Sequence, residues 1–231
     1  MPVNPEKCVV LPVGHSEPYH YQLNSLTLEV KSTVRDLGVL IQSNLKGHAQ
    51  CRVAESKAWK KYWMLRRAFS NFTPATFAKL FATTIRPTLE YCAPAWAPCS
   101  KKNAWHLERV QRAGSKHVRG LGHLSYEDRL RSMNLFSLSY RRRRGDLITL
   151  FRILSGLCGD ELRNLFKYNS RSGRRGHSRV LLQPRCDSLQ TAILFSARTI
   201  PHWNRLSDWV VSAPSITTFK SRRDKVLDCT L

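Results

Sequence analysis

Cysteine and histidine side chains gather in the middle of the 231-residue chain, where metal or nucleophilic chemistry is the first possibility to weigh. Cys92, Cys99 and His106 follow one another at intervals of seven residues, with His117 and His123 beyond them. This spacing fits no common zinc pattern, and the seven cysteines include no C-x-x-C pair. We therefore expect no metal site, no disulfide framework, and mostly buried thiols.

Sequence motifs for hydrolysis and nucleotide binding are also missing, because the chain has no G-x-S-x-G, no H-E-x-x-H and no P-loop. His177, close to Arg175 and Arg179, is the histidine most suited to a function. No carboxylate lies within nine residues of His177 to orient its ring, which favours contact with a phosphate or a base over acid–base catalysis. We expect no catalytic residue in this chain.

Positive charge dominates the composition, with 38 Lys and Arg against 16 Asp and Glu, a net charge of +22 and a pI near 10.3. Arginines outnumber lysines by 25 to 13, and the planar guanidinium suits bidentate phosphate contacts. The expected partner is therefore RNA or DNA, bound through its phosphate backbone. The alternative is a charge that serves only solubility.

The residues expected to contact nucleic acid lie on four stretches of the chain. They are Lys57, Lys60, Lys61, Arg66 and Arg67; Arg109, Arg112, Lys116 and Arg119; Arg141, Arg142, Arg143 and Arg144; and Arg174, Arg175, His177 and Arg179. The second set faces away from an apolar helical stripe and contacts either phosphate or only solvent. The third set places four positive charges at a helix start, which is unfavourable without an anion. It indicates a binding element, a nuclear-import patch or a fortuitous solvated run.

Tryptophans could also contact nucleic acid by stacking on bases, although helical spacing favours the protein core for each of them. The six are Trp59, Trp63, Trp96, Trp105, Trp203 and Trp209.

Hydrophobic periodicity and capping residues predict a mainly α protein with a small N-terminal antiparallel β-hairpin or sheet, an α+β fold. Strands are expected within residues 7–42, including a turn at Asn24–Ser25 and a short strand from Leu37 to Ile41. Helices are expected over 47–69, from Pro74 onward with Thr73 as the N-cap, over 101–120, over 125–133 with Ser125 as the cap, over 137–154 with a stop at Gly156, and over 191–209 and 215–227. A basic loop at 168–179 precedes the last two.

Membrane insertion is not expected, because no stretch approaches the ~18 to 20 apolar residues that a span requires. Glu6 and Lys7 also interrupt the place where a signal peptide would be apolar. We expect an intracellular protein, nuclear or associated with ribonucleoprotein.

Several short motifs, in order along the chain, resemble the C-terminal third of non-LTR (LINE-type, jockey-like) retrotransposon reverse transcriptases. The motifs are Lys7–Leu11, Val34–Val39, Ile85–Cys92 with Trp96 and Pro98, Glu108–Arg112, Ser125–Leu130, Arg141–Ile148, Arg175–His177, Trp203–Leu206 and Thr218–Lys220. Each motif is weak alone, and their shared order carries the resemblance.

The resemblance implies three parts: residual palm and junction strands at 1–45, a thumb-like helical domain at 46–167, and a basic loop with C-terminal helices at 168–231. It also implies that Lys7 matches a lysine near the incoming nucleotide's phosphates. The upstream palm and fingers would be partners if the polyprotein is expressed as a whole.

The chain departs from that family's catalytic pattern, because a polymerase of this kind needs paired aspartates to hold two divalent metals. No Asp-Asp dipeptide occurs in the sequence. We expect a nucleic-acid-binding fragment without a cofactor of its own, whereas the complete polymerase would need Mg²⁺. The alternatives are a degenerate transposon remnant without activity, or a host RNA-binding or scaffold protein derived from such an element.

Overall fold

The computed structural model describes residues 3–14, 20–98, 100–169, 177–186, 191 and 193–227. These residues form a mainly helical protein with small β-pairs near the N-terminus, which confirms the expected α+β class. The chain divides into two compact units, residues 1–138 and 139–231, and each is described by itself. The division expected at 45 and 167 stays a prediction.

The β-structure of the first unit consists of three two-stranded pairs among the described residues. A 3₁₀ turn at Pro5–Lys7 precedes β1 (Val9–Val10), which pairs in parallel with β4 (Glu29–Val30). Strands β2 (Gln22–Leu23) and β3 (Leu26–Thr27) are antiparallel, and the positive φ angles of Asn24 and Ser25 between them confirm the expected turn.

The third pair joins β5 (Thr33–Asp36) to β6 (Val39–Gln42), so the strand expected from Leu37 to Ile41 begins two residues later than predicted. Leu37 and Gly38 instead form the turn, with φ angles of +43° and +85°. Val39 is buried in the helical core, and the Gln42 side chain accepts a hydrogen bond from the Ala49 N–H at the start of the next helix. This hairpin packs on the helices that follow.

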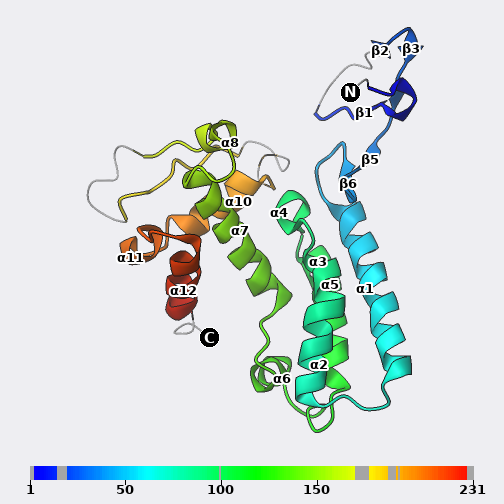
Figure 1. Ribbon diagram of the computed structural model, residues 1–231, viewed down its shortest axis with the longest axis vertical. Coiled ribbons are helices and arrows are strands. Elements are labelled where there is room, and N and C mark those ends of the chain that lie inside the picture. Colours follow the sequence, from blue (N-terminus) through cyan, green and yellow to red (C-terminus); the bar gives the residue numbers. More distant parts are fainter. Residues whose placement is uncertain are drawn as a thin grey trace. The chain divides into compact units, whose positions relative to one another are not determined.

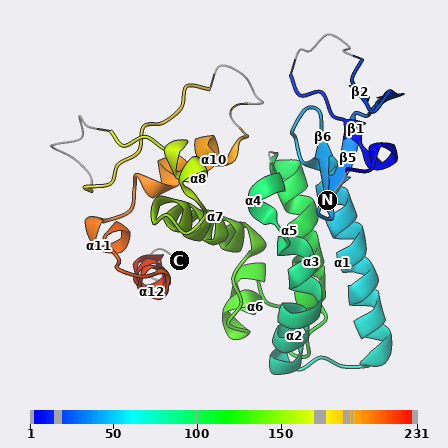
Figure 2. The same cartoon turned by 45° about the horizontal axis from the view of Figure 1, so that its top comes forward.

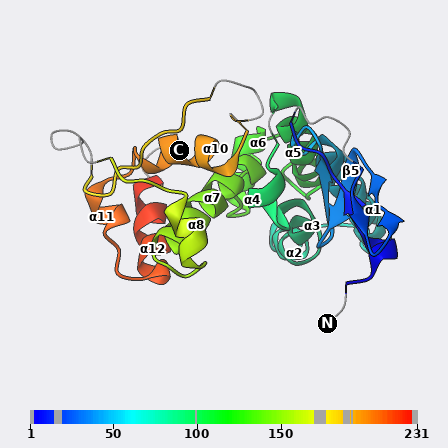
Figure 3. The same ribbon diagram turned by 90° about the horizontal axis from the view of Figure 1, so that it is seen from above.

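The helices of the first unit are α1 (His48–Ala68), α2 (Pro74–Leu80), a π-helical turn η2 (Phe81–Ile85), α3 (Arg86–Glu90), α4 (Ala93–Trp96), α5 (Lys101–Lys116) and α6 (Tyr126–Ser132). Thr73 and Ser125 cap α2 and α6 as the sequence predicts. Helices α1 and α5 lie side by side, with α3 against α1 (Figure 1, Figure 2). Figure 3 shows the same helices from above.

Helix α1 does not bury the aromatic face that its sequence suggests. Its buried side chains include Ala54, Ala58 and Tyr62, whereas Trp63 is 54% exposed. Small alanines let the backbones of α1 and α5 approach closely, and Gly114 of α5 leaves the space that the Tyr62 and Phe77 rings fill. Trp63 therefore lies on a neighbouring stripe of the helix that remains open.

The second unit contains α7 (Leu138–Leu154, which begins at the last residue of the first unit), α8 (Asp160–Asn164), α10 (Phe195–Trp203), α11 (Asp208–Val211) and α12 (Ile216–Leu227). Its core includes Leu150, Phe151, Trp203 and Phe219. The Phe219 ring stacks on Phe151 and Trp203, with centroid distances of 4.4 and 6.0 Å. The long helix of this unit ends near Gly156 (φ +76°), as expected.

Candidate nucleic-acid interface

A depression of ≈ 960 Å³ lies over α1 and α5 in the first unit. Its lining residues are Arg52, Glu55, Ser56, Trp59, Lys60, Trp63, Arg67 and Arg109. Four of these side chains are cationic and one is acidic. The surface therefore carries a net positive charge and fits an anionic ligand better than a neutral one.

The single carboxylate of this depression is already paired inside the protein. Glu55 Oε1 lies 3.5 Å from Arg109 Nη2 and 3.4 Å from His106 Nδ1. Arg52, Lys60 and Arg67 are exposed around it. Glu55 thus orients Arg109 and leaves the charge of the other three cations facing solvent.

Two further basic depressions adjoin the first. One of ≈ 690 Å³ shares Lys60 with it, and one of ≈ 470 Å³ shares Arg109. The second depression includes Arg35, Lys57, Lys60 and Lys61, and the third includes Arg109, Arg112, Lys116 and Arg129. Seven of the predicted cations thereby line one continuous basic surface, which we call the α1–α5 surface: Lys57, Lys60, Lys61, Arg67, Arg109, Arg112 and Lys116. Arg66 and Arg119 line none of the three depressions.

Some predicted contact residues of this unit have structural roles. Lys61 Nζ donates to Thr84 O at 3.0 Å and Thr88 Oγ1 at 2.6 Å, which ties α1 to the η2–α3 segment. The Arg66 guanidinium carbon lies 5.8 Å from the Phe72 ring centroid, and that of Arg112 lies 4.0 Å from the Tyr126 centroid. Such stacking holds a guanidinium in place and still leaves N–H donors at its edge.

Tyr126 belongs to a buried polar link below this surface. Its hydroxyl donates to Glu108 Oε1, which also accepts the Leu138 N–H at 3.0 Å. Burial, and then the negative charge of Glu108, raise the pKa of Tyr126 well above its usual value. Glu108, the acid of α5, is therefore hydrogen-bonded inside the protein and does not neutralise the exposed cations.

Arginines 141–144 in the second unit do not form an exposed patch as a group. Arg142 is 7% exposed, Arg141 and Arg144 are partly buried, and Arg143 is exposed. Helical geometry turns successive residues by about 100°, so four neighbours cannot share one face. The prediction of a common binding element over this run is weakened by the placement of Arg142 and Arg144.

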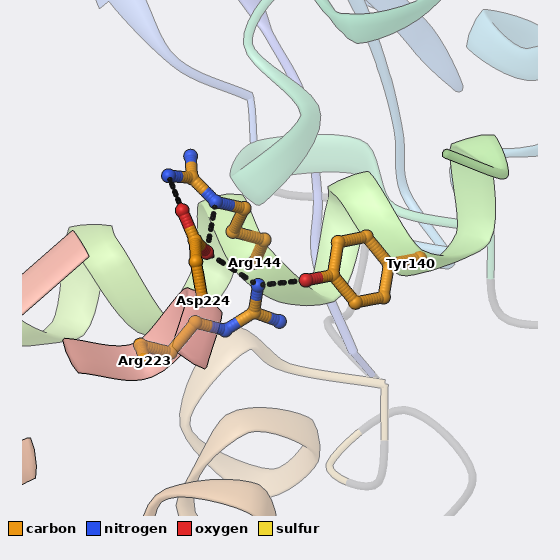
Figure 4. A network of polar contacts seen from close by, with 4 residues as sticks. All are labelled: Tyr140, Arg144, Arg223 and Asp224. Atoms are coloured by element: carbon orange, nitrogen blue, oxygen red, sulfur yellow. Dashed lines mark hydrogen bonds and ion pairs between the residues drawn. The ribbon is translucent and has the colours of Figure 1, made fainter. Parts of the chain in front are cut away.

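Arg144 takes part in a network with Tyr140, Arg223 and Asp224 (Figure 4). Its guanidinium donates to both Asp224 oxygens at 2.8 and 2.6 Å, and Arg223 Nη1 donates to Tyr140 Oη at 3.0 Å. Burial alone would raise the pKa of Asp224, but hydrogen bonds and positive charge from Arg144 and Arg223 lower it below its usual value. The network joins α7 to α12.

Asp224→Asn should reduce stability at neutral pH, and the deficit should shrink as the solution becomes acidic. A carboxylate with a lowered folded-state pKa stabilises the fold above the unfolded value of about 4, and this contribution is lost as pH falls through the folded pKa. Urea unfolding of wild type and variant between pH 7 and pH 2 measures the difference. Asp160→Asn, at an exposed carboxylate of α8, is the control, and an Asp224→Asn deficit that stays constant with pH would contradict this assignment.

His177 is buried and engaged on both ring nitrogens. Its Nδ1 accepts the Arg179 N–H at 3.1 Å, so Nε2 is the donor to Trp203 O at 3.1 Å. Arg179 Nη1 donates to Val211 O, and Trp203 Nε1 donates to Arg179 O. In this arrangement His177 holds a chain segment against α10, and neither of its ring nitrogens is left for the expected phosphate contact. Arg179 is exposed and uses only Nη1 in the bond to Val211 O, so its expected contact stays a prediction.

The remaining expected residues are dispersed. Arg174 and Arg175 lie outside the described residues. Lys7 is exposed at the end of the N-terminal 3₁₀ turn, and Arg119 is exposed beyond the end of α5.

The predicted contact residues omitted three cations that line the α1–α5 surface: Arg35, Arg52 and Arg129. Trp63 and Trp105 are 54% and 51% exposed, and Trp209 of the second unit is 47% exposed, so the core prediction was wrong for these three. It was correct for Trp96 and Trp203. The exposure of Trp63 could have been inferred from the sequence. Trp59 and Trp63 are spaced i, i+4 on a helix whose alanines form a separate stripe that can pack against the core.

Among the described residues, no group of three or more His, Cys, Asp or Glu side chains is arranged to hold a metal ion. The described cysteines are free thiols, and Cys51 is buried, whereas Cys92 and Cys186 are exposed. The expectation of mostly buried thiols was therefore wrong. None of the described helices is both long and apolar enough to cross a membrane.

Comparison with known proteins finds a relative whose own role is uncharacterized. An uncharacterized protein of Caenorhabditis elegans is 28% identical over 126 residues, covering 53% of this chain and 64% of the relative. The chain thus spans less than two thirds of that relative's length. No family model and no solved structure matches the chain.

Proposed function

We propose that this chain binds RNA or DNA through the phosphate backbone, without sequence specificity, on the α1–α5 surface. The observation that carries the proposal is the set of exposed cations around one depression, in which the only acid is paired to Arg109. Phosphate groups complement such a surface, and their binding releases counterions.

The charge imbalance continues along both helices. Helix α1 holds six Lys and Arg against the single acid Glu55, and α5 holds five against the single acid Glu108. A solvated helix surface normally carries both signs in similar number, whereas cations greatly outnumber acids on these two helices. Flexible Arg and Lys side chains that reach phosphates position a nucleic acid without reading its bases, which is why we propose nonspecific binding.

The same proposal extends to the origin of the chain. Nucleic-acid binding is what a C-terminal part of a non-LTR retrotransposon polymerase would supply, and the ordered motifs that resemble that family support this reading. In that case nucleotide addition and its Mg²⁺ would depend on paired palm aspartates, and the given sequence contains no Asp-Asp pair. A nuclear or ribonucleoprotein location follows from the same proposal.

Binding of the full chain to a fluorescent 20-nucleotide strand should weaken steeply as salt rises. Six phosphate contacts would give a log–log slope of about −4 to −5. Replacing Arg52, Lys60 and Arg67 together by glutamine should reduce the magnitude of that slope by roughly 2 to 3, since each lost contact contributes about 0.7 to 0.9. Fluorescence anisotropy from 50 to 300 mM salt measures both values.

A matched triple variant tests whether the position of the charges matters. Lys79, Lys101 and Lys102 are exposed in the same unit and line none of the three depressions. Their replacement by glutamine removes the same net charge and should change the slope by less than half as much. Equal effects of the two triples, or binding that does not depend on salt, would refute the proposed surface.

A further inference from the structure

Two tryptophans, one lining the α1–α5 surface and one beside its Arg109, are left half exposed on neighbouring helices. Trp63 on α1 is 54% exposed and Trp105 on α5 is 51% exposed. Large aromatic side chains gain most from burial, and a group of them on a surface marks a place where another molecule binds. The partner must therefore carry negative charge and also present a face that can contact tryptophan rings.

These tryptophans end a row of flat groups that crosses from α1 to α5. Trp63 stacks on Trp59 with centroids 6.3 Å apart and planes inclined by 23°. The Arg109 guanidinium carbon lies 5.7 Å from the Trp59 centroid and 5.5 Å from the Trp105 centroid. We call Trp63, Trp59, Arg109 and Trp105 the aromatic row.

Internal contacts hold the row in place before any ligand binds. Glu55 lies 3.5 Å from Arg109, Trp59 is partly buried against the core, and Tyr62 contacts both tryptophans of α1 edge-on. A rigid aromatic surface loses little conformational entropy when a planar ligand stacks on it.

The charge around the row decides which planar ligand fits. An aromatic cage for a quaternary ammonium would need a negative surrounding, but Arg52, Lys60 and Arg67 are cationic and Glu55 is occupied by Arg109 and His106. A nucleobase attached to a phosphate chain supplies both the flat face and the anion. In a duplex, each base face is covered by its neighbours, so the ligand must contain unpaired bases.

We propose that the aromatic row stacks unpaired bases of single-stranded RNA or DNA while Arg52, Lys60 and Arg67 contact the adjacent phosphates. This inference rests on the proposed function and sharpens it, since it predicts that single strands bind more tightly than duplex of the same length. Base–aromatic stacking is tolerant of sequence because every base has a π face.

The test compares three probes of equal length on the full chain: a single-stranded oligonucleotide, an abasic strand that keeps only sugar and phosphate, and the duplex, which carries twice the phosphate charge of either strand. Trp63→Ala and Trp105→Ala should each weaken binding of the single strand by roughly 5- to 100-fold. The abasic strand and the duplex should change by less than about twofold. Trp63→Phe and Trp105→Phe, which keep a flat ring, should restore most of the single-strand affinity.

The exposed position of both side chains makes unfolding an improbable cause of lost binding, and an unchanged circular-dichroism melt of each variant checks this directly. The proposed base stacking would be refuted if the wild-type chain bound the single-stranded and abasic probes with equal affinity. It would also be refuted if the alanine variants weakened binding of all three probes equally. Either result would leave the proposed phosphate binding unaffected. A wild-type chain that binds none of the three probes would instead refute the proposed function.

Discussion

Trp203→Ala should destabilise the second unit by about 3 to 5 kcal/mol, which is the usual cost of removing a fully buried tryptophan. Trp203 is 0% exposed, stacks on Phe219, and donates from Nε1 to Arg179 O at 2.9 Å. Its removal would leave a cavity and free the carbonyl of the segment that His177 anchors. A melting temperature lower by roughly 15 to 30 °C is expected for a unit of this size.

Trp209→Ala is the matched control, because Trp209 is 47% exposed and lies in the same unit. The Arg222 guanidinium carbon lies 5.1 Å from the centroid of its ring. A loss within about 1 kcal/mol is expected. Hydrogen exchange measured by mass spectrometry would localise the damage, and protection of α10 and α12 that is equal in the two variants would show the core assignment to be wrong.

The second large loss of stability is expected on replacement of Gly47, which links β6 to α1. Its φ is +59°, and a Cβ at this position would lie 2.5 Å from the carbonyl oxygen of Trp96. Gly47→Ala should cost roughly 3 kcal/mol, with about 1 to 2 from the left-handed backbone and the rest from the clash with the α4 backbone. Chemical denaturation of the full chain measures the loss.

Gly120→Ala separates these two contributions. Gly120 has φ +78°, and a Cβ there would meet nothing within 4 Å. This variant should therefore show only the backbone cost, about 1 to 2 kcal/mol. If both variants lose the same stability, the close approach of Gly47 to Trp96 is not a feature of the folded protein in solution.

Local sequence signals predicted the elements well where the physical cause is itself local. Thr73 and Ser125 accept hydrogen bonds from backbone N–H groups three residues later, and Asn24–Ser25 forms the expected turn. Caps and tight turns depend on a few consecutive residues. The start of β6 was misjudged because Leu37, although apolar, takes a positive φ next to Gly38.

The residues of the α1–α5 surface could be predicted only in part. Charge composition pointed to the cations of both helices, and the sequence placed Lys60, Arg67 and Arg109 among them. It did not indicate that Arg52 and Trp63 border the same depression as Arg109. That proximity depends on the close packing of α1 on α5, which the small residues Ala54, Ala58 and Gly114 permit. The two helices are separated by about 60 residues of sequence, so local patterns do not reveal this contact.

The sequence by itself determined the helical class, the excess of positive charge, the caps and most helix boundaries, since these follow from composition and near-neighbour interactions. Tertiary structure alone decided which charges face solvent. Arg142, Arg144 and His177 look like binding residues in the sequence, but the fold uses them for internal hydrogen bonds, ion pairs or burial. The physical reason is that a charged side chain is available to a ligand only when folding brings no partner or covering side chain to it.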